Sequence, residues 1–190
     1  QPLCWRAMAE PFKNLINAEV VKLMRRHLQS AWAGFDGARF EALGNDGLAS
    51  LELKARAQHL CAALEATLPA DFESAAGVIE ASLAPMRGDE ALSDQRAGDH
   101  GLAGWSVWPL AEFVARRGLA TPERALRVLH AITQRFTAEW AVRPFIAEHP
   151  ILAFETLHRW ARDASPHVRR LASEGSRPRL PWGAQLKGLI

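Results

Sequence analysis

Two glutamates in the second half of the chain, Glu139 and Glu174, each stand between two arginines at helical spacing. Residues three or four apart on a helix are neighbours, so each carboxylate can pair with guanidinium groups. The simpler interpretation is ion pairing on helix surfaces, at roughly 0.3–0.5 kcal/mol per pair. The alternative is a pair of carboxylates from adjacent helices that face one groove and stay ionised because the arginines lower their pKa. The flanking residues are Arg135 and Arg143 for the first glutamate, and Arg170 and Arg177 for the second.

Ionised carboxylates in a groove suit the cleavage of a glycosidic bond, because their charge stabilises a developing sugar cation or aligns the attacking water. A tryptophan could support this chemistry. Trp182 follows a proline-bounded break and stands close to Arg177 and Arg179. An exposed indole binds flat or cationic rings by stacking and cation–π attraction, worth roughly 0.5–2 kcal/mol. The other tryptophans beyond residue 104 are expected to be mostly core residues: Trp105, Trp108, Trp140 and Trp160.

Other common motifs are missing from the sequence. It has no P-loop, no dinucleotide-binding fingerprint, no Gly-x-Ser-x-Gly elbow and no His-Glu-x-x-His pair. We therefore expect neither a cofactor nor a metal ion. Cys4 and Cys61 show no metal spacing or disulfide framework, which favours a reducing, cytoplasmic setting. No run of about 18 apolar residues predicts a membrane span, and a monomer is the expected state.

The distribution of charge is more informative than the net charge of +2, which is too small to indicate a polyanionic partner. Residues 131–190 contain nine lysines and arginines against five acidic residues. A basic C-terminal half is compatible with a phosphate-binding surface. A solvated helix surface with excess arginine explains the same composition equally well.

The stretch 167–182 (HVRRLASEGSRPRLPW) must be positioned by a helix and a forced break. Ser165 is suited to a helix N-cap and Pro166 to the first helical position. Val168 and Leu171 then fall on one buried stripe. Gly175 and the following prolines end the helix and deliver Trp182 onto a new turn.

The remaining sequence predicts helices almost everywhere, because strand signals are missing and apolar residues recur at helical spacing. Short antiparallel helices joined by tight turns predict an all-α protein, either an α-solenoid or an irregular bundle. Residues 85–101 are predicted to form a loop. The expected helices are one capped by Asn17, a short one near Phe40, and helices over 48–68, 72–83, 104–117, from 122, 139–148, 152–163 and from 166.

Three stretches resemble the AlkC-type DNA alkylation-repair glycosylases, within the superfamily of DNA glycosylases with HEAT-like repeats. They are 167–182, 10–17 (EPFKNLIN) and 136–145 (FTAEWAVRPF). The resemblance covers residues 8 to 190. It implies an α-solenoid of HEAT-like helical repeats whose basic concave surface surrounds duplex DNA. It also implies excision of cationic alkylated bases, chiefly 3-methyladenine and, in the AlkC branch, 3-methylcytosine.

The same resemblance assigns roles to individual residues. Glu139 and Glu174 fall on the active-site carboxylates of the family, and Trp182 falls on an active-site aromatic residue. The arginines expected to bind the DNA are Arg143, Arg170, Arg177 and Arg179. A further aspartate of the family lies beyond Ile190. We therefore expect one helical-repeat domain over 8–190, truncated at its C-terminal end, and an N-terminal extension over 1–7.

Two hypotheses follow. The first is a monofunctional glycosylase for cationic alkylated bases in duplex DNA. The second is a non-catalytic helical-repeat module that binds DNA structure or a protein partner. The two glutamates favour the enzyme, because a pure phosphate binder gains nothing from carboxylates in its basic groove.

Overall fold

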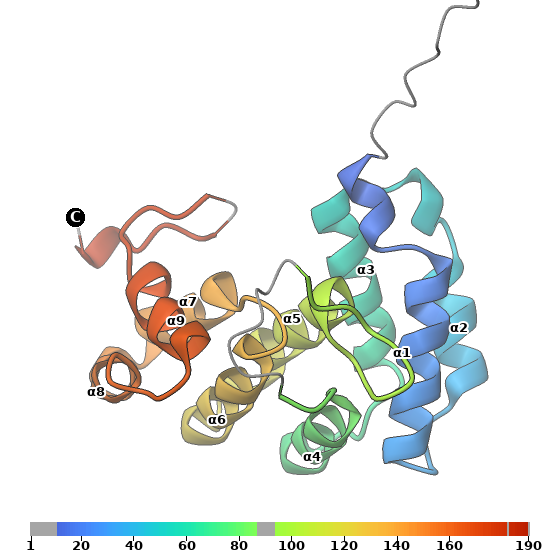
Figure 1. Cartoon of the computed structure of the whole chain (residues 1–190), viewed down its shortest axis with the longest axis horizontal. Helices are drawn as coiled ribbons and strands as arrows, with labels where there is room; N and C mark the ends of the chain where they lie inside the picture. Colours follow the sequence, from blue (N-terminus) through green and yellow to red (C-terminus); the bar gives the residue numbers. More distant parts are fainter. Residues whose placement is uncertain (1–10, 87–93, 182, 190) are drawn as a thin grey trace, which may run out of the picture.

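A computed structural model describes residues 11–86, 94–181 and 183–189 of the chain (Figure 1). This part of the chain is built from helices, and none of its residues forms a β-strand longer than an isolated bridge. The α-helices are α1 (Ala18–Ala31), α2 (Gly37–Asn45), α3 (Leu53–Glu65), α4 (Phe72–Ser82), α5 (Trp108–Arg117), α6 (Pro122–Thr133), α7 (Glu139–Glu148), α8 (Pro150–Trp160) and α9 (Pro166–Gly175). The short 3-10 helices are η1 (Phe12–Leu15), η2 (Leu48–Ser50), η3 (Gly104–Val107) and η4 (Lys187–Leu189).

Local sequence signals set where most helices begin. The side chain of Asn17 accepts hydrogen bonds from the first amides of α1, as predicted. Asp71 accepts from the amide of Ser74 at the start of α4 in the same way. Proline occupies the first position of α9, where it needs no amide partner. Ser165 is the N-cap residue of α9, but its side chain makes no capping hydrogen bond.

The helices stack in two layers. Helices α3, α5, α7 and α9 pack in succession to form an inner layer, and α4, α6 and α8 follow one another in an outer layer. The pair α1 and α2 completes the N-terminal end against α3 and α4. In Figure 1 the segment after α9 and the helix η1 lie on the same side of the molecule, beyond the inner layer. The predicted fold class, an α-solenoid of HEAT-like helical repeats, is confirmed.

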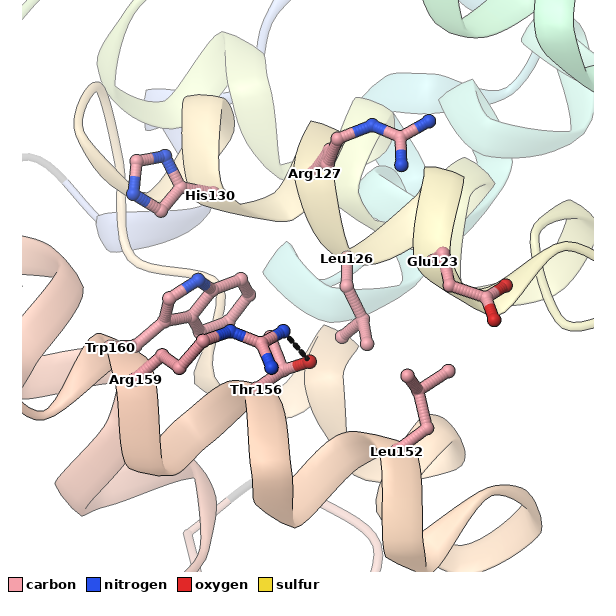
Figure 2. A pocket seen from close by; sticks show the side chains of 8 residues that line it. All are labelled: Glu123, Leu126, Arg127, His130, Leu152, Thr156, Arg159 and Trp160. Carbon is pink, nitrogen blue, oxygen red and sulfur yellow. Dashed lines mark hydrogen bonds between the residues drawn. The ribbon is translucent and has the colours of Figure 1, made fainter.

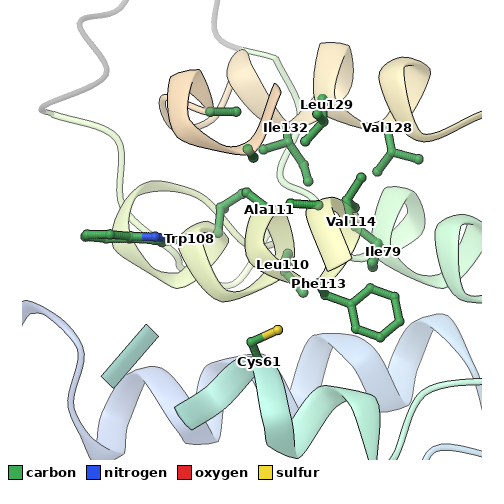
Figure 3. Close-up of a cluster of buried hydrophobic side chains, with 14 of the residues drawn as sticks. Cys61, Ile79, Trp108, Leu110, Ala111, Phe113, Val114, Val128, Leu129 and Ile132 are labelled. Atoms are coloured by element: carbon green, nitrogen blue, oxygen red, sulfur yellow. The ribbon is translucent and has the colours of Figure 1, made fainter. Parts of the chain in front are cut away.

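A continuous apolar core joins the layers. Its central part, shown in Figure 3, lies between α3, α4, α5 and α6 and contains Ile79, Leu110, Phe113 and Ile132, all almost fully buried. Each such side chain contributes roughly 1.5–3 kcal/mol when removed from water. Cys61 belongs to this core, and burial raises the pKa of its thiol to about 12. It is therefore a packing residue without a reactive thiolate.

The predicted helix over 48–68 is shorter than expected. Residues 48–50 form η2, Leu51 is extended, and α3 begins only at Leu53. The buried guanidinium group of Arg56 explains the break. It donates to the carbonyl oxygens of Leu51 and Ala49, and also to two in the segment 13–16, and so holds the two chain segments together.

The described part of the predicted loop over 85–101 is fixed to its neighbours. The amide of Ala84 and the carbonyl of Leu102 form a hydrogen bond of 3.0 Å, and Arg26 and His27 of α1 both contact the carbonyl oxygen of Gly98. Gly101 has a φ of 140°, and a Cβ there would lie 2.4 Å from the amide nitrogen of Ala84. Only glycine fits this position. Among the helices of the described residues, none has the length and apolar character needed to cross a membrane.

Candidate active site

Glu139 is the first residue of α7, and only 5% of its surface is exposed. Its Oε1 lies 3.5 Å from Nε of Arg170, which extends from α9. Burial raises the pKa of Glu139 above its ordinary value, against the opposing effects of its own backbone amide and of Arg170. The predicted environment of this carboxylate is therefore wrong in two respects: Arg135 and Arg143 are not its partners, and its pKa is raised instead of lowered.

The two expected partners of Glu139 are engaged elsewhere. Arg135 donates from Nε to the carbonyl oxygen of Ala84 and from a terminal nitrogen to that of Ala131. Arg143 is fully buried and donates only to backbone carbonyl groups. A residue four positions away on a helix is a possible partner, but Glu139 at the helix start faces α9 instead.

Glu174 lies near the end of α9 and keeps one predicted partner. Its Oε2 is 2.9 Å from a terminal nitrogen of Arg177, and about a quarter of its side chain is exposed. Its charge contributes to raising the pKa of Glu139, so the two carboxylates are close enough to interact. The close packing of α7 on α9 brings them together. A Cβ on Gly175 would lie 2.6 Å from Cγ1 of Val142, so this contact requires a glycine.

The structure divides the four arginines expected to bind DNA into two groups. Arg170 and Arg177 have side chains that are more than half exposed, and Arg179 is also exposed. All three are accessible to a phosphate. The prediction for Arg143 is wrong, because a side chain with no exposed surface cannot reach one. Trp182 lies outside the described residues, although its neighbour Pro181 is described.

An aromatic cleft of about 430 Å³ adjoins the start of α7. Its rings pack on one another, with centroids 4.9 Å apart for Trp105 and Phe136 and 4.7 Å apart for Trp108 and Trp140. The hydroxyl of Thr137 and Nε1 of Trp140 are buried without a hydrogen-bond partner. The residues that line the cleft are Phe12, Leu53, Trp105, Trp108, Phe136, Thr137, Trp140 and Pro181.

The expectation that these tryptophans are mostly core residues is confirmed for Trp108 and Trp160 and corrected for Trp105 and Trp140. Trp105 and Trp140 are half-buried, and Trp108 reaches the cleft with its small exposed part, whereas Trp160 is buried as expected. Helical spacing could not distinguish a tryptophan that lines a cleft from one in the core. The spacing predicts which face of a helix is apolar, but not which other segments pack on that face. Sequence reasoning also missed Glu112, whose carboxylate accepts a 3.1 Å hydrogen bond from Nε1 of Trp108. Its signal was a glutamate four residues after a tryptophan.

A second hollow, of about 560 Å³, lies between α6 and α8 (Figure 2). In Figure 2 the side chain of Arg159 lies along α8 and points to Thr156, with Trp160 and Leu126 on the walls of the hollow. A terminal nitrogen of Arg159 donates to the hydroxyl of Thr156 at 2.9 Å. It belongs to the outer layer, away from the carboxylates. We therefore take the inner layer at the start of α7 as the candidate site.

The fold and this site define a class of protein: a HEAT-like helical-repeat protein that carries paired carboxylates and accessible arginines on its inner layer. No protein-family model matches the chain. The chain is 33% identical over 178 residues to the uncharacterized protein YhaZ of Bacillus subtilis strain 168. That match covers 93% of this chain and 45% of YhaZ.

Structural comparison is more specific. The chain is similar to Pseudomonas fluorescens alkylpurine DNA glycosylase AlkC, solved bound to DNA containing an abasic-site analogue, with a TM-score of 0.79 and 27% sequence identity. The match covers 95% of this chain and 46% of AlkC. The resemblance to the AlkC-type DNA glycosylases is therefore confirmed. The chain spans less than half the length of either matched protein.

Proposed function

We propose that this chain is the helical-repeat part of a DNA glycosylase that hydrolyses the N-glycosidic bond of cationic alkylated bases in duplex DNA, namely 3-methyladenine and 3-methylcytosine. The observation that carries the proposal is the convergence of Glu139 and Glu174 from α7 and α9. The similarity to AlkC over 95% of the chain supports it.

The proposed reaction asks little of the protein beyond charge and position. An N3-alkylated base already carries a positive charge, so it leaves without protonation by a general acid. As the C1′–N bond breaks, its electron pair goes to the base, which becomes neutral, and the sugar becomes oxocarbenium-like. Ionised Glu139 and Glu174 stabilise this cation, most strongly where protein excludes water.

Water completes the reaction. Its oxygen bonds to C1′ and it loses a proton, for which Glu174 is the better placed acceptor because it is the more exposed of the two carboxylates. The products are a free base and an intact abasic site, as expected of a monofunctional enzyme. No metal ion or cofactor is proposed for this reaction.

The surroundings of the carboxylates suit a cationic ring on DNA. The aromatic cleft offers π-faces that attract cations, and the exposed side chains of Arg170, Arg177 and Arg179 are proposed to bind phosphates. Trp182 is proposed to contact the lesion from the segment that also brings Pro181 to the cleft.

The competing function is a helical-repeat module that binds DNA structure or a protein partner without catalysis. A buried glutamate with a raised pKa argues against it, because such a group destabilises the fold and weakens phosphate binding. Catalysis gives the same group a use, since its charge acts at a developing cation.

The deciding experiment measures the bases released from methylated duplex DNA by mass spectrometry. It compares this chain with a longer protein that also includes the part of the relatives that this chain does not cover. Release of 3-methyladenine, leaving abasic sites that break only on alkali treatment, supports the proposal. Duplex binding by both proteins without release of any methylated base would favour the binding module.

A further inference from the structure

Arg143 occupies the middle of α7 and, among the residues that the structure describes, is the largest side chain with no exposed surface. Its guanidinium group donates to the carbonyl oxygens of Gly175 at 2.9 Å, Arg177 at 2.7 Å and Pro178 at 3.0 Å. Its Nε donates to the carbonyl oxygen of Ala184. All four acceptors lie in residues 175–184, which we call the anchored segment.

The four carbonyl groups stabilise a buried charge. A guanidinium group removed from water destabilises the fold unless its donors are satisfied, and here donors on all three nitrogens have acceptors. The carbonyl group of Gly175 also belongs to the end of α9, where the helix dipole favours a cation. Burial lowers the pKa of Arg143, but the arginine remains charged at any ordinary pH.

The anchored segment has few other restraints. None of its described residues after Gly175 belongs to a helix. At its start, the amide of Arg177 and the hydroxyl of Ser176 donate to carbonyl groups of α9. Further along, the amide of Gly183 donates to Leu180 and that of Leu186 to Pro178. Gly183 lies against the arginine, because a Cβ there would be 3.0 Å from Cδ of Arg143.

This segment carries the residues that complete the candidate site. Glu174 directly precedes it, Arg177 and Arg179 project from it, and Pro181 lines the aromatic cleft. A side chain on α7, which also begins with Glu139, therefore fixes the part of the chain that follows α9. Because Glu139 and Arg143 belong to the same helix, the anchor holds Glu174 and the anchored segment in place relative to Glu139.

The chain uses the same device at the opposite side of the cleft. Arg56 is 4% exposed and donates to the carbonyl oxygens of Lys13, Ile16, Ala49 and Leu51. Its contact with Lys13 holds η1, whose Phe12 lines the cleft. Two buried arginines thus hold the two irregular segments that meet around one cleft.

We propose that Arg143 is a positioning residue, which sets the anchored segment against α7 so that Glu174, Arg177 and Pro181 face Glu139 and the aromatic cleft. The part of this proposal that concerns excision rests on the proposed function. The part that concerns the anchored segment does not.

The test compares Arg143→Met and Arg143→Lys with Arg124→Met. Arg124 is a matched control because it is also mostly buried and makes three charge-assisted hydrogen bonds, to Glu73 and Glu80, but lies in the outer layer. Hydrogen exchange of residues 176–187, duplex affinity and single-turnover base release are measured at a temperature at which circular dichroism shows all variants folded. If Arg143→Met does not fold, Gly183→Ala disturbs the same anchor without removing the charge.

We expect Arg143→Met to accelerate exchange in residues 176–187 but not in α1–α4, to weaken duplex binding, and to slow base release roughly 10²-fold. Arg143→Lys should restore part of each effect, because it keeps the charge with fewer directed donors. The control should change none of these. Unchanged exchange overturns the anchor, and faster exchange with unchanged release and affinity overturns the positioning role. If the unmodified protein releases no base, the proposed function fails, and exchange together with duplex affinity still decides the role of Arg143.

Discussion

Nε of Arg170 lies 3.5 Å from Oε1 of Glu139, and this ion pair connects α9 to α7. The partners differ sharply in exposure, because the arginine side chain is 59% exposed and that of the glutamate only 6%. The buried carboxylate therefore depends on a cation that solvent and DNA phosphates can also reach. The pKa of Glu139 therefore responds to the charges of Arg170 and Glu174.

Replacing either carboxylate by its amide should abolish most base release while leaving the fold intact. Glutamine keeps the shape and hydrogen bonding of Glu139 or Glu174 but removes the charge that stabilises the sugar cation. We expect each change to slow single-turnover release of 3-methyladenine by about 10²–10³-fold, with affinity for an undamaged duplex retained. Glu155→Gln, on the exposed surface of α8, is the control. Unmodified rates in both variants would leave the carboxylates as ion-pair partners only.

The pH dependence of release should follow the raised pKa of Glu139. The reaction needs the ionised form, so the rate should fall with decreasing pH at a point above the ordinary glutamate pKa. Arg170 lowers this pKa and Glu174 raises it. Arg170→Met should therefore move the acid limb to higher pH, and Glu174→Gln should move the limb of its residual activity to lower pH. Shifts in the opposite directions, or none, would contradict the electrostatic assignment.

The same pKa makes a prediction about stability. The folded state binds the proton of Glu139 more tightly than the unfolded state, so stability is lost as pH rises through the folded pKa. Glu139→Gln should therefore raise the Tm at neutral pH, and the gain should vanish below the ordinary glutamate pKa. Thermal unfolding of the two proteins across this range measures the difference. If the Tm of Glu139→Gln at neutral pH were equal to or below that of the unmodified protein, this account would be refuted.

The exposed arginines should act through counterion release. Neutralising Arg170, Arg177 or Arg179 should weaken binding to all duplex sequences alike and reduce the slope of log K against log salt by about one unit per lost phosphate contact. Arg127→Gln, on the exposed face of α6, should leave the slope unchanged. Titrations at several salt concentrations give the slopes. Equal slopes for all variants would show that these arginines do not contact phosphates.

Gly175→Ala should disturb the approach of α9 to α7. The added methyl group would lie 2.6 Å from Cγ1 of Val142, so the helices must separate. We expect a loss of about 1–3 kcal/mol in the free energy of unfolding, measured with urea, and slower base release. Adding Val142→Ala should recover part of both, because it opens space at the same contact. If the losses of the two single variants simply add in the double variant, the clash with Val142 is not the cause of the destabilisation.

The sequence by itself determined most of the helices and the residue types of the site. Asn17 at the start of α1 and the proline that opens α9 act on amides a few residues away, so their effects can be read locally. Glu174 and Arg177, three residues apart, remain partners for the same reason. Apolar spacing predicted an all-α protein, either a solenoid or an irregular bundle, because each helix must bury one face against its neighbours. The choice of the solenoid came from the family resemblance.

The tertiary structure decided what surrounds each charged or aromatic group. Glu139 is paired with Arg170 of another helix, and Arg143 is turned toward four carbonyl groups in a segment more than thirty residues away. Trp140 lines a cleft and is only half-buried. Desolvation and the satisfaction of buried donors depend on which segments pack together, and neither is encoded at helical spacing. The raised pKa of Glu139 and the anchoring role of Arg143 therefore became visible only in the fold.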